Sequence, residues 1–396
     1  MTVLEQFGKD VVLSGWGHTR FGKLDSTHEE LIVEAAAEAV RNAGIEASDI
    51  DEIFVGHFNS GMVPLAFPSS LALQLSADLV GVPATRVENA CASGSAAFQQ
   101  GVKSILAGTA KTVLVIGAEK MTAAGADVVG AALLGADYEM AGAKSDTGFA
   151  ELFAHVADTY EGRYRNPSAT MGSIAAKNHS NGLNNPYAHL RKDFGVDFCQ
   201  TVSEKNPIVA GLLRRTDCSP VSDGAAAVVL TTAGNRSSSA ATAGARLTGF
   251  GQANDFLPSS KRDPIAFAGS ATAWQRAMSM AGTELTDLSF AEVHDCFTIA
   301  ELLMYEVMGL TSPGEGHRAI EEGWVYRDGR FPVNVSGGLK SKGHPVGATG
   351  VSQHVIAAMQ LTDTAGEMQL PAPQRAAVHN MGGLAVANYV SVLERI

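Results

Sequence analysis

Several features are scarce in this chain of 396 residues, and each scarcity excludes a class of protein. The four cysteines, with no C-x-x-C pair, are too few for a disulfide framework, so we expect reduced thiols and a cytoplasmic, reducing compartment. No run of lysine and arginine stands out, and the net charge is −12, which argues against a nucleic-acid or anionic-membrane surface. No apolar stretch is long enough for a bilayer, and no signal pattern opens the sequence, so we expect no membrane span.

What the chain does contain is a repeated strand–helix–strand pattern. The apolar segment 11–17 runs into a Gly-x-Gly turn, and so does segment 245–251. A helix follows each segment and ends at a glycine, Gly44 in the first copy and Gly282 in the second, as a left-handed C-terminal residue prefers. Because strands alternate with helices in both copies, the sequence predicts an α/β protein with buried sheets.

The repeat divides the chain into three parts. We predict a first half made of residues 1–120 and 216–235, and a second half made of residues 245–396. Residues 121–215 are rich in Gly, Ala, Asn and aromatics and have weaker strand character, so we interpret them as a loop insertion over the active site. The small, polar segment 233–245 is the predicted linker between the halves.

Cys91 is the first candidate for chemistry. It lies among small residues, in Asn-Ala-Cys-Ala-Ser-Gly-Ser, at a predicted strand-to-helix turn. The N–H groups and dipole of a helix N-terminus favour a thiolate, so we expect a lowered pKa and a nucleophile with room for a substrate. The alternative is a small buried core residue, which is the commonest fate of a free cysteine. The local sequence does not separate the two interpretations.

Three further candidates follow in the second half. His344 lies in a glycine-rich loop, Lys-Gly-His-Pro-Val-Gly, where it could take a thiol proton; the alternative is a surface histidine. His294 and Cys296 belong to His-Asp-Cys-Phe, directly after a strand-like segment, and active sites of α/β proteins collect at such strand ends. Cys296 could move a proton to and from a carbon acid, and His294 could donate to a thioester oxygen. Without the other motifs, core packing explains Cys296 better.

The same residues raise two more interpretations, a metal site and an oxyanion hole. The spacing of Cys91, His294, Cys296 and His344 fits no familiar zinc pattern, so we expect no metal. Gly382 follows a predicted strand in His-Asn-Met-Gly-Gly, where exposed backbone N–H groups could stabilise an oxyanion. On local grounds a plain turn explains these glycines better.

Together these motifs resemble the thiolase superfamily, above all its sterol carrier protein x type and archaeal acetoacetyl-CoA thiolases. The match runs in order through nearly the whole chain: Cys91 with its small neighbours, Ser222-Asp223-Gly224, His294-Asp295-Cys296-Phe297, Gly343-His344-Pro345-Val346-Gly347 and Asn380-Met381-Gly382-Gly383. The resemblance implies the thiolase fold, with two βαβαβ halves in five α-β-α-β-α layers. It also implies a homodimer or homotetramer that takes acyl-CoA and CoA as substrates and uses no metal or redox cofactor.

For the site residues the resemblance implies distinct roles. Cys91 becomes the acylated nucleophile, His344 activates it, and Cys296 is the acid/base for carbon–carbon bond chemistry. His294 and His344 form one oxyanion hole, and the backbone N–H groups of Cys91 and Gly382 form the other.

The chain departs from better-known thiolases in a compensated way. Asn380 stands where they carry their second cysteine, and His-Asp-Cys-Phe replaces their Asn-Glu-Ala-Phe, so a thiol is lost from one loop and gained in another.

The leading hypothesis is therefore an acetyl-CoA C-acyltransferase. The alternatives are a condensing or aldolase-type enzyme of the same fold that uses another acceptor, and a non-catalytic acyl-CoA-binding subunit of a complex. Between residues 121 and 177 only Lys144, Arg163 and Arg165 are basic, so a small OB-fold partner protein could supply the clamp for the CoA phosphate.

Overall fold

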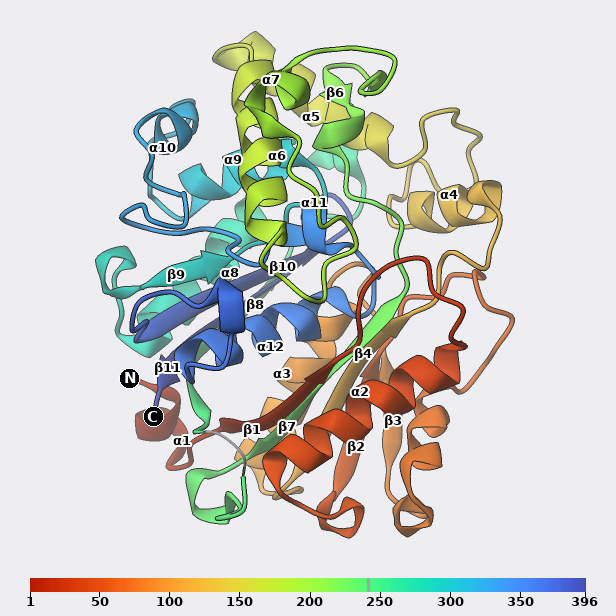
Figure 1. Ribbon diagram of the computed structural model, residues 1–396, viewed down its shortest axis with the longest axis vertical. Coiled ribbons are helices and arrows are strands. Elements are labelled where there is room, and N and C mark those ends of the chain that lie inside the picture. Colours follow the sequence, from red (N-terminus) through yellow and green to blue (C-terminus); the bar gives the residue numbers. More distant parts are fainter. Residues whose placement is uncertain (241–242) are drawn as a thin grey trace.

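The computed structural model describes residues 1–240 and 243–396 as a mixed α/β protein built on a nine-stranded sheet (Figure 1). The strand order is β3-β2-β4-β7-β1-β8-β11-β10-β9, and a separate ribbon pairs β5 with β6. The strands are β1 Val12–His18, β2 Glu52–Gly56, β3 Ala84–Val87, β4 Val113–Glu119, β5 Ile208–Ala210, β6 Leu213–Arg214, β7 Gly224–Thr231, β8 Ala245–Asn254, β9 Phe290–Glu292, β10 Arg375–Gly382 and β11 Ala387–Arg395. The helices are α1 Val3–Phe7, α2 His28–Ala43, α3 Ser93–Ala107, α4 Ala126–Leu134, α5 Ala150–Arg163, α6 Ser168–Gly182, α7 Gly195–Gln200, α8 Ala268–Ala281, α9 Thr298–Val307, α10 His317–Glu321, α11 Gly338–Lys342 and α12 Thr349–Leu361.

The sheet consists of two half-sheets with one plan. In the first, β4 lies between β2, which is parallel to it, and β7, which is antiparallel to both β4 and β1. In the second, β10 lies in the same way between the parallel β9 and the antiparallel β11, which also pairs with β8. The two half-sheets meet where Val12 and Leu13 of β1 pair with Arg246 and Ala245 of β8. This repetition confirms the two predicted α/β halves.

Helices complete five layers around the half-sheets. The helices α3 and α12 pack on each other in the middle; α12 touches β7 of the first half-sheet and β10 of the second. The outer face of the first half-sheet is covered by α2, which packs on β1 and β7, and the outer face of the second by α8, which packs on β8 and β11 (Figure 1). The predicted thiolase-like layering is thereby confirmed.

In both halves, glycines inside a strand let a helix pack closely against it. The predicted Gly-x-Gly turns are wrong, because Gly17 lies inside β1 and Gly251 inside β8. A Cβ on Gly17 would lie 2.2 Å from the carbonyl oxygen of Ala35, and one on Gly251 would lie 2.1 Å from that of Ala273. These glycines therefore let α2 and α8 approach their strands closely. The predicted left-handed helix ends are confirmed, with φ of 64° and 59° at the two C-terminal glycines.

The predicted loop insertion, residues 121–215, contains four helices, α4 to α7, and the ribbon of β5 and β6. Its helices α5 and α6 pack against α9 of the second half. Residues 241–242 of the predicted linker lie outside the described residues.

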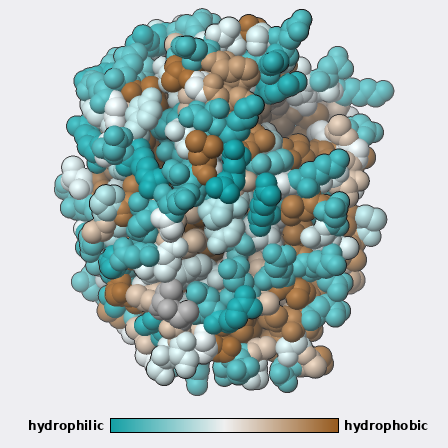
Figure 2. Space-filling view, viewed as in Figure 1, coloured by the Kyte–Doolittle hydropathy of each residue, from teal (hydrophilic) through white to brown (hydrophobic). Residues whose placement is uncertain are grey.

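Figure 2 shows polar side chains over most of one face, with hydrophobic ones gathered along the side where α4 lies in Figure 1. In the described part of the chain no helix is long and apolar enough to cross a membrane.

Candidate active site

Cys91 lies in the sharp turn between β3 and α3. Ala90 adopts φ of 49°, a left-handed conformation that is strained for a residue with a side chain, and the backbone N–H of Ala92 closes the turn on the carbonyl of Asn89 at 3.0 Å. Cys91 is only 5% exposed, and this burial raises the pKa of its thiol to about 12, although backbone hydrogen bonds oppose the shift. The expected lowering of the pKa by the helix N-terminus is therefore wrong, because desolvation outweighs it.

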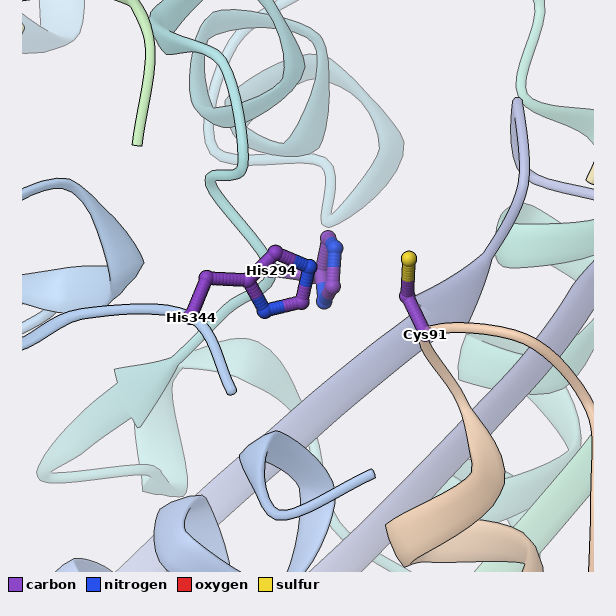
Figure 3. A group of neighbouring side chains, drawn as sticks. All are labelled: Cys91, His294 and His344. Atoms are coloured by element: carbon purple, nitrogen blue, oxygen red, sulfur yellow. The ribbon is translucent and has the colours of Figure 1, made fainter. Parts of the chain in front are cut away.

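Two histidines from the second half face this thiol (Figure 3). His294 follows β9, and His344 lies in the loop between α11 and α12. Their rings are 5.1 Å apart and nearly perpendicular, at 85°. The Cys91 sulfur and one ring nitrogen of each histidine all lie within 4.8 Å of one another. The structure thus brings three of the four predicted catalytic side chains together from loops far apart in the sequence.

The orientation of His344 suits a base. Its Nδ1 lies 2.6 Å from the hydroxyl of Thr349, and that hydroxyl donates its own proton to the carbonyl of Pro345 at 3.0 Å. The hydroxyl must therefore accept from Nδ1–H, which leaves Nε2 with a lone pair. That Nε2 is buried and has no partner among the described residues. Burial lowers the pKa of His344 to about 3, so the ring is neutral and able to accept a proton.

Cys296 is the fourth predicted side chain, and it lies close enough to Cys91 for the two thiols to interact electrostatically. It is 4% exposed, and burial together with the nearby Cys91 thiol raises its pKa well above the ordinary value. The loop that carries it is tied to the segment before β7, because its carbonyl accepts the backbone N–H of Ser219 at 2.9 Å. Both thiols are therefore held in the protonated form when the site is free of substrate.

The glycines at the end of β10 approach the Cys91 turn closely. A Cβ on Gly382 would lie 2.2 Å from the carbonyl oxygen of Asn89, so no larger residue fits there. Backbone hydrogen bonds reach the Cys91 thiol from Gly383, which has φ of 61°, and from Cys91 itself. The role of the Gly382 N–H group in an oxyanion hole stays a prediction.

Two buried carboxylates hold the loops of the site in place. Glu119, at the end of β4, accepts the backbone N–H groups of Phe58, Asn59 and Gly347 at 2.9–3.0 Å. It thereby joins the loop after β2 to the loop of His344. Asp295 accepts the backbone N–H of Leu339 at 2.6 Å in the same manner. Sequence reasoning missed both carboxylates, because neither lies beside its partners in the chain.

A cleft of about 740 Å³ lies next to the Cys296 loop, because Phe297 is part of its lining. One wall is α4, and the other is the segment from Cys218 to Val221 with Phe297. Apolar side chains separate the cleft from Cys91; they include Met121, Val129 and Val346. Lys23 and Lys144 are the basic residues of its lining, whereas Arg163 is paired with Asp263. The cleft thus combines a mostly apolar lining with two cations that could bind an anionic group.

The chain is similar to known proteins over most of its length. Residues 11–234 match the family model described as thiolase, N-terminal domain, and residues 251–395 match the one described as thiolase C-terminal domain-like. The acetyl-CoA acetyltransferase of Methanothermobacter thermautotrophicus is 35% identical over 98% of this chain and 100% of its own. Sterol carrier protein 2 of Bos taurus is 30% identical over 94% of this chain and 70% of its own.

Solved structures show the same fold at lower identity. The Ltp2-ChsH2(DUF35) aldolase superposes with a TM-score of 0.78 at 20% identity, over 98% of each chain. Human mitochondrial 3-ketoacyl-CoA thiolase in complex with CoA superposes with a TM-score of 0.74 at 18% identity, over 100% of this chain and 99% of its own.

Proposed function

The chain belongs to the thiolase family and is an acyltransferase, and from that premise we propose that it cleaves or forms 3-oxoacyl-CoA through a thioester on Cys91. The observation that carries the proposal is the convergence of the Cys91 sulfur with a nitrogen of each of two histidines, all within 4.8 Å and all buried. The reaction uses CoA and acyl-CoA as substrates and requires no resident metal or cofactor.

In the first half-reaction Cys91 attacks the carbonyl carbon of the acyl-CoA. Because its pKa is about 12, the thiol gives up its proton only as the sulfur–carbon bond forms, and the lone pair on Nε2 of His344 receives that proton. The carbonyl oxygen gains negative charge, and the backbone N–H groups of Cys91 and Gly382 are the proposed donors to it. The proton on His344 then passes to the sulfur of the departing CoA, which leaves an acyl group on Cys91.

In the second half-reaction a carbon–carbon bond forms or breaks. In the cleavage direction Cys296 gives its proton to the carbon next to the departing thioester, and its raised pKa keeps that proton on the thiol in the resting enzyme. In the condensation direction the Cys296 thiolate takes the proton from that carbon. The oxygen of that thioester becomes enolate-like. His294 donates to this oxygen, and His344 joins it as a donor when protonated. The enolate carbon attacks the Cys91 thioester, or departs from it in the reverse direction.

The cleft beside α4 is the proposed route for the CoA arm. Its apolar walls suit the pantetheine chain, and Lys23 and Lys144 are the cations available for phosphate. Two lysines supply little positive charge for the phosphate groups of CoA. One structural neighbour is the Ltp2-ChsH2(DUF35) aldolase. A small OB-fold partner that completes the clamp is the second proposal for this chain.

A homodimer or homotetramer is the proposed assembly. The outermost strand of the first half-sheet is β3, which pairs only with β2 among the described strands. Its free edge can pair with a second copy of the chain. Because β3 leads directly into the Cys91 turn, such pairing would brace the nucleophile.

The test is intact-protein mass spectrometry after mixing with short and medium acyl-CoA esters. We expect the wild-type chain to gain one acyl mass and Cys91→Ala to gain none. A wild-type chain that gains no acyl mass with any ester, alone or with an OB-fold partner, would contradict the acyltransferase mechanism. If the chain alone binds CoA with micromolar affinity, the need for a partner is contradicted.

A further inference from the structure

The side chain of Asn380 joins two of the proposed catalytic residues. It projects from β10, is fully buried, and its Nδ2 makes two contacts. One reaches the carbonyl oxygen of Cys91 at 3.1 Å, and the other reaches Nδ1 of His294 at 3.0 Å. An amide nitrogen carries two protons, so one group can serve both contacts.

These contacts determine which way the amide faces. The carbonyl of Cys91 can only accept a hydrogen bond, so the atom beside it must be the amide nitrogen and not the amide oxygen. The opposite orientation would set two oxygens against each other. The second proton of the amide then points at Nδ1 of His294, which must accept it and is therefore unprotonated.

We propose that Asn380 is a positioning residue that fixes the His294 tautomer with its proton on Nε2. Burial lowers the pKa of His294 well below its ordinary value, so the ring is neutral and carries one proton. With Nδ1 occupied by the amide, that proton resides on Nε2, which is buried and has no partner among the described residues. His294 thus presents a hydrogen-bond donor to the site. The importance of this donor for catalysis rests on the proposed function.

The two histidines therefore hold opposite tautomers, each set by its own neighbour. Thr349 accepts from Nδ1–H of His344, so the Nε2 of that ring is a base. Asn380 donates to Nδ1 of His294, so the Nε2 of that ring is a donor. Both rings are buried, so the difference between their tautomers comes from their neighbours. The hydroxyl of Thr349 accepts a hydrogen bond, whereas the amide of Asn380 donates one.

The tautomer of His294 also bears on whether Cys91, His294 and His344 can bind a metal ion. The sulfur of Cys91 and the two ring nitrogens are close enough to hold an ion. A ligating nitrogen needs a lone pair, and the Nε2 of His294 has a proton in its place. The three side chains therefore do not form a ready metal site while Asn380 is in place.

The backbone packs closely around the side-chain amide of Asn380. A Cβ on Gly350, in the first turn of α12, would lie 2.4 Å from Oδ1 of Asn380. The amide is thus enclosed between α12, the Cys91 turn and the His294 loop.

The experiment is ¹⁵N NMR of histidine-labelled protein, wild type and Asn380→Asp, with His294 assigned by comparison with His294→Gln. The shifts of the two ring nitrogens report directly which one is protonated. In the wild type we expect His294 to be unprotonated at Nδ1 and protonated at Nε2. A carboxylate can only accept, so in Asn380→Asp we expect Nδ1 to become protonated. A wild-type His294 protonated at Nδ1, or an unchanged Nδ1 in the variant, would overturn the proposal.

The kinetic consequence is measured at a pH where the spectrum of Asn380→Asp shows a neutral His294 ring. Loss of the Nε2–H donor should slow carbon–carbon bond formation by about 10²–10³-fold, as for other oxyanion donors, while Cys91 is still acylated. A condensation rate unchanged in that state would contradict the role of the donor.

Asn388→Asp is the matched control. Asn388 is buried on β11, bonds to Ser270, and makes no hydrogen bond with His294 in the described part of the chain, so its substitution tests the cost of a buried carboxylate alone. It should leave the His294 shifts unchanged, and a shift of the His294 nitrogens there would overturn the specific role of Asn380. The NMR result does not depend on turnover, so a chain with the expected tautomers and no acylation refutes the proposed function and leaves the tautomer assignment standing.

Discussion

The carboxylate of Asp295 accepts the backbone N–H of Leu339 at 2.6 Å, and this hydrogen bond ties together the two loops that carry His294 and His344. Asp295 lies between His294 and Cys296 in the chain, and Leu339 is in the short helix α11 that leads to His344. The amide of Asn178, from the insertion, donates to the same carboxylate at 2.8 Å. One buried side chain thus sets the spacing of residues that the proposed reaction needs at ångström precision.

Asp295→Asn should weaken both stability and turnover. The wild-type carboxylate accepts from three donors, whereas an amide puts N–H groups against one of them, at a cost of about 1–3 kcal/mol in the free energy of unfolding. We expect a lower melting temperature and a kcat reduced at least about tenfold with little change in KM, because alignment rather than binding is lost. The exposed Asp328→Asn is the control. Wild-type kcat in Asp295→Asn would refute this role.

The reactivity of Cys91 should keep rising with pH. Only the thiolate reacts with iodoacetamide, and a pKa of about 12 means that its rate of alkylation should increase roughly tenfold per pH unit from pH 7 to 10. An ordinary thiol would level off near its pKa of about 8.5. Peptide mass analysis assigns the modified site, and Cys91→Ala gives the background. A plateau near pH 8 would mean that a thiolate is already formed in the free enzyme.

Cys296→Ala should separate the two half-reactions. Cys91 and His344 are intact in this variant, so the acyl mass gain should remain. The exchange of a proton with carbon loses its acid/base, so carbon–carbon bond cleavage and formation should slow by about 10²–10⁴-fold. Rapid-quench kinetics with a 3-oxoacyl-CoA, together with the mass measurement, checks both parts. Unchanged turnover would show that another group moves the proton.

Acid should destabilise the protein through its buried histidines. Burial lowers the pKa of six of them to about 3 or 4: His18, His28, His179, His344, His354 and His379. Their unfolded pKa is near 6.5, so the stability that comes from keeping them neutral is present above pH 6.5 and is lost as the pH falls toward 4. We expect the free energy of unfolding to drop steeply in that interval, with several protons taken up.

A single-site variant makes this acid response quantitative. His354 stacks on Phe98 at 3.8 Å and bonds to Gly350 and Ser391, away from the catalytic atoms. His354→Gln should reduce the slope of stability against pH by about 1.4 kcal/mol per pH unit between pH 6 and 4.5, which corresponds to one proton. Denaturant titrations at a series of pH values measure this slope. An equal slope in both proteins would mean that His354 does not titrate on unfolding.

Much of the fold could be read from local pattern. The glycine-ended helices and the alternation of strands and helices predicted two similar α/β halves, because these signals depend on residues three or four positions apart. Two other glycines were misread, because their role is in packing: Gly17 and Gly251 lie inside strands, and a helix backbone approaches each of them. The insertion, predicted as loop, holds helices that packing against α9 supports.

The candidate site divides in the same way. The sequence by itself determined which chemical groups are available and in what order, since thiols, imidazoles and glycines are visible as residues in motifs. Only the tertiary structure decided their ionisation and their proton positions. The pKa of Cys91 is raised because distant segments exclude water from it, and Asn380 reaches the carbonyl of Cys91 from 289 positions away. Desolvation and hydrogen bonds between remote segments have no local signature, so they arise only when the two halves pack together.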